Sequence, residues 1–354
     1  MRCMMVGFSK VAQTDHFPVY VNRGVEIAAV VDICPARLLK AQTLLPGCRV
    51  YNSLDQALAL EKVDFCDVAV PPYRHADSVL KCLRNRLPVI CEKPLVVEQE
   101  ELIEILRAIE TYGVMLFPCH TWQYSAQMRD VKNIMAQEGI GNPLRLEVKI
   151  LRTGASLGTP EWKPRWRTCL EIAGGGIFMD HGYHMLYLAQ NLLQARPCGL
   201  QVLDAQRDPS GLELDLALQF EFAPFAAPDA RLTARAHLTW LAEERVTSYH
   251  LFGSQGFILI ENEKTTWKNV TQQERIAADG GLTSSSEHPL WFDQLFQHFL
   301  ECLHQGNLFH EELLKACFTM QAIWASYASG EDKKYQLINT TKWASFFNAS
   351  PRPC

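Results

Sequence analysis

Three glycines in the middle of the chain precede an acid and an imidazole that together could move a proton. The run extends from Gly174 to His184, and within it Asp180 and His184 stand four residues apart. That spacing places two side chains on one face of a helix. Imidazole titrates near neutral pH, and a carboxylate can orient it or stabilise its cation. Glycines let backbone come close to a ligand or a neighbouring segment. The run therefore predicts a proton-handling pair on a helix that begins after a glycine turn.

A second candidate is the lysine of Glu92-Lys93-Pro94, which directly follows a predicted strand at residues 88–91. At the rim of a parallel sheet, Lys93 could hydrogen-bond a substrate hydroxyl or favour its deprotonation through its charge. Pro94 would fix the local backbone, and its peptide bond could be cis. With an imidazole base and a bound dinucleotide, these groups would suffice to oxidise an alcohol.

The loop after the first predicted strand is a candidate for phosphate binding. It contains Gly7, Ser9, Lys10 and Ala12 in a pattern close to G-x-G-x-x-A, with a serine as the middle residue. The Ser9 hydroxyl could bind an oxyanion and Lys10 could supply charge, although an ordinary strand-to-helix turn is the alternative. Asp32 closes the next strand, where an acid accepts hydrogen bonds from the adenosine ribose and repels a 2'-phosphate. This arrangement favours NAD over NADP.

Two further segments bear on the cofactor. Pro71 and His75 follow a predicted strand at residues 65–70, and such strand ends pass close to bound ligands in parallel sheets. His75 could contact the nicotinamide ribose or simply begin a helix. Arg37 could soften the preference for NAD, but on an exposed helix we expect it to face solvent.

Two domains are needed to position these residues. Short apolar runs alternate with helical segments through the first third of the chain, which predicts a doubly wound parallel sheet of Rossmann type in residues 1–122. Beyond residue 200, longer runs alternate apolar and polar residues, as in Glu213–Phe220, which is typical of an antiparallel sheet with one covered face. We expect an α/β protein whose residues 123–354 form an α+β domain with a large, mostly antiparallel open sheet.

The order of these motifs resembles the Gfo/Idh/MocA oxidoreductase family. The resemblance implies that Lys93 contacts the hydroxyl being oxidised, that Asp180 binds substrate and supports proton transfer, and that His184 is the general base. It also implies an NAD(P)-dependent dehydrogenase or reductase acting on a sugar, a sugar derivative or a cyclitol. The residues expected to contact the cofactor are Gly7, Ser9, Lys10, Ala12, Asp32, Pro71, His75 and Glu92. Those expected to shape the substrate pocket are His120, Trp122, Trp166, Arg167 and His181.

Bulk properties narrow the possibilities further. A net charge of -5 argues against general nucleic-acid affinity, and no apolar run has the length of a membrane span. The twelve cysteines include no C-x-x-C pair and have no regular spacing, so we expect reduced thiols and no metal site. We also expect a cytoplasmic protein. A metal bound by Asp180, His181 and His184 is unfavourable because His181 should point away from the shared helix face. An apolar outer face on the second sheet would pair between subunits and give a homodimer or homotetramer.

Two other functions stay open at this point. A dinucleotide-binding regulatory or scaffold protein without turnover would fit the serine at position 9, whereas Lys93, Asp180 and His184 favour an enzyme. Imine reduction on the same fold would use Lys93 and His184 as proton donors.

Overall fold

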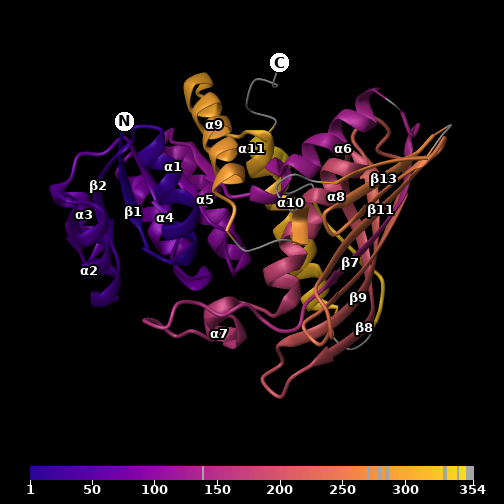
Figure 1. The fold of residues 1–354 in the computed structure, drawn as a ribbon, viewed down its shortest axis with the longest axis horizontal. Helices are drawn as coiled ribbons and strands as arrows, with labels where there is room; N and C mark the ends of the chain where they lie inside the picture. Colours follow the sequence, from indigo (N-terminus) through magenta and orange to yellow (C-terminus); the bar gives the residue numbers. More distant parts are fainter. Residues whose placement is uncertain are drawn as a thin grey trace.

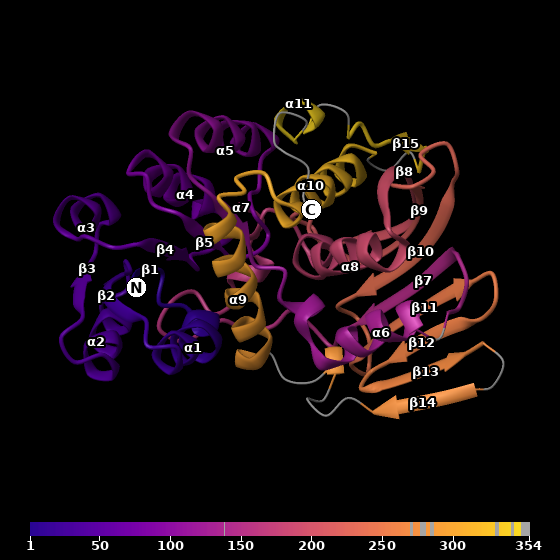
Figure 2. The ribbon, with the colours of Figure 1, turned by 90° about the horizontal axis from the view of Figure 1, so that it is seen from above.

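Two separate β-sheets organise the chain, one built from its first third and the other from residues after 142 (Figure 1). The computed structural model describes residues 1–137, 139–269, 272–276, 281–283, 287–329, 333–340 and 343–347. Helices cover both faces of the first sheet, and further helices lie between it and the second sheet (Figure 2). The two sheets therefore face a shared central region.

The first sheet has six parallel strands in the order β3-β2-β1-β4-β5-β6. The chain winds outward from β1 in both directions, which is the order of a Rossmann fold. The predicted doubly wound parallel sheet is confirmed. The strands are β1 (Arg2–Val6), β2 (Glu26–Val31), β3 (Arg49–Tyr51), β4 (Phe65–Val68), β5 (Val89–Cys91) and β6 (Leu116–Pro118).

Helical crossovers join these parallel strands. The last of them, α5 (Gln99–Tyr112), starts with a capping box between Glu98 and Glu101 and ends where Gly113 takes a left-handed φ of 64°. These local signals explain why the sequence marks its boundaries well. The other helices are α1 (Phe17–Asn22), α2 (Pro35–Leu44), α3 (Leu54–Leu60) and α4 (His75–Arg84), with a π-turn at Ala12–His16 and a 3-10 turn at Pro72–Arg74.

The second sheet has nine strands in the order β14-β13-β12-β11-β7-β10-β9-β8-β15. Every pair is antiparallel except β7 with β10, so the prediction of a mostly antiparallel open sheet is confirmed. The strands are β7 (Pro143–Leu151), β8 (Ala195–Arg207), β9 (Glu213–Pro224), β10 (Leu232–Thr239), β11 (Val246–Gly253), β12 (Phe257–Glu261), β13 (Lys264–Lys268), β14 (Gln272–Ile276) and β15 (Gln336–Leu337).

One face of this sheet is covered by helices and the other is not (Figures 1 and 2). On β9 the covered face carries Leu216, Leu218 and Phe220, which are buried. The covering helices include α6 (Ala126–Gln137), α8 (Tyr183–Leu193) and α10 (Glu311–Ala328), and the short helices are α7 (Leu170–Ala173) and α11 (Ala344–Phe347).

The uncovered face is polar along the central strands. Its outward side chains include Glu147, Lys149, Asp215, Gln219 and Arg235, which are exposed or half-buried. The apolar outer face from which a homodimer or homotetramer was expected is therefore not observed on these strands, and the oligomeric state stays a prediction. Among the described helices, none combines the length and apolarity required to cross a bilayer.

A helix from the end of the chain covers the first sheet rather than the second. Helix α9 (Pro289–Gln305) packs Phe292 and Phe296 against Phe65 and Tyr20, and these rings form a T-shaped and tilted cluster. These residues belong to the expected second domain, residues 123–354, yet the helix packs on the sheet of the first domain. The two parts of the chain are thus joined by apolar burial as well as by the residues of the cleft.

Candidate active site

A cleft lies between the two sheets, where β1, β4 and β5 end. Its walls come from the turns after these strands, from the segment after β6 and from the long loop and π-turn that lead from β7 to α8. The predicted site residues that line it are Ser9, Lys10, Pro71, Glu92, Lys93, Trp122, Trp166, Arg167, Asp180, His181 and His184. The other predicted site residues are buried behind its walls and are Gly7, Ala12, Asp32, His75 and His120.

An ion pair between Lys93 and Asp180 joins the two sides of the cleft. Lys93 Nζ lies 2.7 Å from Asp180 Oδ1 and 2.8 Å from the Asp180 carbonyl oxygen. The Lys93–Pro94 peptide is cis, which the proline had suggested. Burial would raise the pKa of the Asp180 carboxyl, but Lys93, His181 and Arg167 together outweigh it and hold that pKa well below its usual range. Asp180 is therefore ionised at neutral pH and holds the lysine in place.

The imidazole of His184 is fixed on two sides. Its ring stacks on Trp122 with centroids 4.2 Å apart and planes inclined by 8°, and its Nδ1 lies 2.8 Å from the Tyr187 hydroxyl. Burial, reinforced by the positive charge of Lys93, lowers the pKa of His184 well below its usual value. The ring is neutral at physiological pH, as a group that accepts a proton requires.

A π-turn at Phe178–Gly182 replaces the first α-helical turn that the Asp180 and His184 spacing predicts. A π-turn closes its hydrogen bonds at i to i+5 and so inserts one residue into the helical path. Asp180 and His184 both line the cleft, as expected, but so does His181. The expectation that His181 points away is wrong, since its Nδ1 lies 3.3 Å from Asp180 Oδ2.

Arg152 is a buried cation that the motifs did not indicate. Its side chain is 2% exposed, and its Nε donates to His181 Nε2 over 3.3 Å. Because Nε2 accepts, the proton of neutral His181 belongs on Nδ1, facing Asp180. Burial lowers the pKa of His181 to about 4, so this ring also stays neutral. The available signal was an arginine directly after a strand that alternates apolar and charged residues.

The other end of the cleft fits a dinucleotide phosphate. Gly7 has a φ of +94°, and a Cβ there would lie 2.7 Å from the Ala69 carbonyl oxygen, so only glycine fits. The Ser9 hydroxyl oxygen is buried without a hydrogen-bond partner in the structure, and Ser9 lines the cleft. An unpaired buried hydroxyl is costly unless a ligand satisfies it. The serine that replaces the expected glycine is thus placed to donate to a phosphate oxygen.

Asp32 sits beside this loop with an arginine against it. Its carboxylate accepts from the Phe8 and Cys34 amides, both at 2.8 Å, and Arg37 Nη1 lies 3.6 Å from Asp32 Oδ2. Arg37 is 7% exposed, so the expectation that it faces solvent is wrong. Its Nη2 donates to Thr159 Oγ1 over 2.7 Å, on the loop after β7. That loop draws the arginine inward, a long-range contact that helix periodicity cannot show.

Two predicted histidines are held inside the protein instead of reaching the cleft. The ring nitrogens of His75 lie 2.7 Å from the Pro94 carbonyl and 2.8 Å from the Val70 carbonyl, so His75 supports the turns that carry the cleft residues. His120 Nδ1 lies 2.8 Å from Glu312 Oε2 on α10, and its Nε2 lies 3.3 Å from the Tyr183 hydroxyl. Both rings position the wall residues around them.

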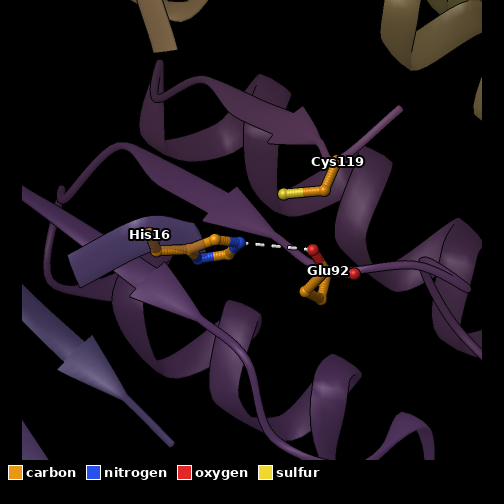
Figure 3. A group of neighbouring side chains, drawn as sticks. All are labelled: His16, Glu92 and Cys119. Atoms are coloured by element: carbon orange, nitrogen blue, oxygen red, sulfur yellow. Dashed lines mark ion pairs between the residues drawn. The ribbon is translucent and has the colours of Figure 1, made fainter. Parts of the chain in front are cut away.

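Glu92 of the cleft wall belongs to a group with the buried residues His16 and Cys119. The three side chains point toward one another (Figure 3). His16 Nδ1 is 2.8 Å from Asp67 Oδ2 and its Nε2 is 3.3 Å from Glu92 Oε1. Burial opposes the charge of the imidazole, but Asp67 and then Glu92 outweigh it and raise the pKa of His16 to about 10. The nitrogen, oxygen and sulfur atoms lie within 4.8 Å of one another and could hold a metal ion, but a cationic His16 satisfies both carboxylates without one.

Comparison with known proteins agrees with this geometry. Residues 1–120 match the model of an oxidoreductase family with an NAD-binding Rossmann fold, and residues 128–259 match the Gfo/Idh/MocA C-terminal domain. The chain is 23% identical to 2,7-anhydro-N-acetylneuraminate hydratase of Escherichia coli, across 84% of this chain and 87% of that protein. It is 34% identical to inositol 2-dehydrogenase of an Arthrobacter species, across 32% of this chain and 34% of that protein.

Solved structures share the whole fold. An oxidoreductase from Agrobacterium radiobacter, in complex with NAD+, L-tartaric acid and magnesium, superposes with a TM-score of 0.80 at 17% identity, covering 96% of this chain and 99% of that one. The aldose-aldose oxidoreductase of Caulobacter crescentus, complexed with glycerol, gives 0.77 at 18% identity, covering 95% and 99%. The chain belongs to the Gfo/Idh/MocA oxidoreductase family, and its first domain is the family's NAD-binding Rossmann domain.

The charge on His16 gives a pH-dependent stability that can be measured. Because its folded pKa of about 10 is above the unfolded value, the stabilisation is complete below about pH 6.5 and is lost as the pH rises toward 10. His16→Gln should lower the free energy of unfolding by about 3 kcal/mol at pH 7 and flatten its decline between pH 7 and 10. Urea denaturation at several pH values measures both effects.

The half-exposed pair of His237 with Asp215, whose nitrogen and oxygen are 2.9 Å apart, supplies the control. His237→Gln should leave both the stability and its pH slope nearly unchanged, since exposed ion pairs contribute little. A wild-type slope that persists in His16→Gln would show that His16 is not a cation at neutral pH.

Proposed function

We propose that this member of the Gfo/Idh/MocA family transfers a hydride between NAD and a hydroxyl-bearing or keto carbon of a sugar, a sugar derivative or a cyclitol. The observation that carries the proposal is that Lys93, Asp180 and His184 all line the cleft, with Lys93 and Asp180 joined across it. In this proposal residues 1–122 bind the dinucleotide, and residues 123–354 hold the substrate. When bound, NAD would supply the hydride chemistry at its nicotinamide ring.

Each of the three residues has a separate role in the proposal. The Lys93 ammonium donates to the substrate oxygen and favours its anionic form. His184 takes the hydroxyl proton during oxidation or returns it during reduction, and burial keeps the ring neutral and able to accept. Asp180 holds Lys93 through the 2.7 Å contact and can reach a second substrate hydroxyl.

The remaining cleft residues favour a polar, oxygen-rich substrate. Trp122 and Trp166 offer aromatic faces, and Arg167 and Arg245 add positive charge to the same wall. Aromatic faces suit the apolar side of a sugar ring, while guanidinium groups suit a carboxylate or phosphate. The names of relatives, an inositol dehydrogenase and a hydratase of an N-acetylneuraminate derivative, point to the same substrate class.

A second candidate is a reaction with no net oxidation. A relative that matches across most of the chain is named a hydratase, and addition of water leaves the overall oxidation level of a substrate unchanged. A cleft that moves a proton and a hydride could return both to the product. Such a protein would convert substrate without accumulating NADH.

The first experiment is a titration of the purified protein with NADH and NADPH, followed by nicotinamide fluorescence. Saturable binding would then justify incubation with NAD and a panel of inositols, sugar acids and N-acetylated sugars. NADH formation supports the dehydrogenase, while product without NADH supports the second candidate. Absence of dinucleotide binding would contradict both.

Substitution of the two reactive groups should separate catalysis from binding. Lys93→Met and His184→Asn should each reduce kcat about a hundredfold or more, because proton transfer and charge stabilisation are lost. The dissociation constant for NADH should change little. Lys149→Met, on the exposed outer face of the second sheet, serves as the control. Near-normal kcat in either cleft variant would remove that residue from the mechanism.

Cofactor preference should depend on the balance between Asp32 and Arg37. Asp32→Asn should weaken NADH binding about tenfold and narrow its advantage over NADPH, because the ribose loses a charged acceptor. Arg37→Met should widen that advantage, because the cation that would receive a 2'-phosphate is removed. Fluorescence titrations of both variants measure the two ratios. If the ratio of the dissociation constants for NADPH and NADH were the same in wild type and both variants, the adenosine ribose would not bind beside Asp32.

A further inference from the structure

Tyr187 is a buried tyrosine that makes two polar contacts, both at the substrate side of the cleft. The Trp122 amide donates to its hydroxyl oxygen over 3.0 Å, and His184 Nδ1 lies 2.8 Å from the same oxygen. The tyrosine itself does not line the cleft, and its ring stacks on His120 with centroids 4.4 Å apart. Any influence on the chemistry therefore passes through the residues that it contacts, and of its two polar partners only His184 can take up or release a proton.

Counting donors and acceptors decides which nitrogen of His184 carries the proton. A backbone amide can only donate, so Tyr187 accepts from Trp122. The phenolic proton then needs an acceptor, and His184 Nδ1 is the one that the structure places within reach. An imidazole nitrogen that accepts a hydrogen bond cannot carry a proton of its own. In the neutral ring the proton is then on Nε2, the nitrogen left for the cleft.

We propose that Tyr187 sets the tautomer of His184, holding it as the Nε2–H form in the free protein. The effect of this tautomer on turnover rests on the proposed function. The cleft then meets a substrate with two donors, the Lys93 ammonium and the His184 Nε2–H. A carbonyl oxygen, which only accepts, is received without any proton movement.

The tyrosine also supports the protonated ring. When His184 becomes an imidazolium, its Nδ1–H needs an acceptor, and the Tyr187 oxygen is already in place. A hydroxyl can turn from donor to acceptor, which an amide or a carboxylate cannot do. Alcohol oxidation requires the other neutral tautomer, in which Nδ1–H donates to the Tyr187 oxygen and Nε2 is free to accept the substrate proton. Tyr187 is thus a positioning residue for both protonation states.

The test reads the tautomer directly. In protein labelled with 15N-histidine, the His184 resonances are assigned by their loss in His184→Gln. We expect a protonated Nε2 and an unprotonated Nδ1 in the free wild-type protein. Tyr187→Phe should move both signals toward the average of the two tautomers. A protonated Nδ1 in the wild type, or unchanged signals in Tyr187→Phe, would overturn the proposal.

The matched control is Tyr183→Phe on the same helix. Tyr183 is equally buried, but its hydroxyl contacts His120 at 3.3 Å, so the His184 signals should not move. NADH binding by each variant verifies that it is folded.

Turnover gives a second, independent readout. With a confirmed substrate, Tyr187→Phe should lower kcat about tenfold with little change in KM, because the hydrogen bond to the charged ring is the stronger one. An unchanged kcat would overturn the positioning role. If no substrate is turned over, the proposed function fails while the 15N spectra still decide the tautomer.

Discussion

The ion pair between Lys93 and Asp180 is the constraint on which the cleft depends. Lys93 lies two residues after the end of β5 in the first sheet, and Asp180 lies in the π-turn before α8, so one contact of 2.7 Å ties the two halves of the site together. Each partner is largely buried, so removal of Asp180 would leave the Lys93 charge buried without its partner, whereas removal of Lys93 would leave Asp180 with Arg167 at 3.7 Å. The same contact fixes the start of α8 and hence the position of His184. The chemistry and the arrangement of the domains therefore share one interaction.

The sequence predicted the architecture and most of the cleft because both have local signals. Strand and helix periodicity revealed the two sheets, and Lys93, Asp180 and His184 stood in recognisable motifs. Burial of Arg37 and the turn of His181 toward the cleft could not be predicted in this way. The first depends on a loop more than a hundred residues away, and the second on a π-turn that inserts one residue into an apparently regular helix.

Helix α9 shows the same limit at the level of domains. Its apolar periodicity identifies a helix, but the pattern does not say which sheet will cover it. The ring of Phe296 packs against Phe65 of the first sheet, and the ring of Phe292 packs against Tyr20 and stacks on His16 at 3.8 Å. This packing removes His16 from water and so strengthens its pairing with Asp67 and Glu92. Glu92, which lines the cleft, is thus held through His16 by helix α9, almost two hundred residues later in the sequence.

Buried histidines in this protein carry different charges because their partners differ. His16 lies between two carboxylates and is cationic, whereas His181 and His184 face Arg152 and Lys93 and are neutral. Burial disfavours charge at all three sites, and only at His16, between two carboxylates, do the partners outweigh it; the single carboxylate of Asp180 beside His181 does not. His184 can take up a proton beside Lys93 only if the partner of its Nδ1 can donate to the neutral ring and accept from the imidazolium. The Tyr187 hydroxyl meets that requirement, and an arginine in its place would not, because it can only donate.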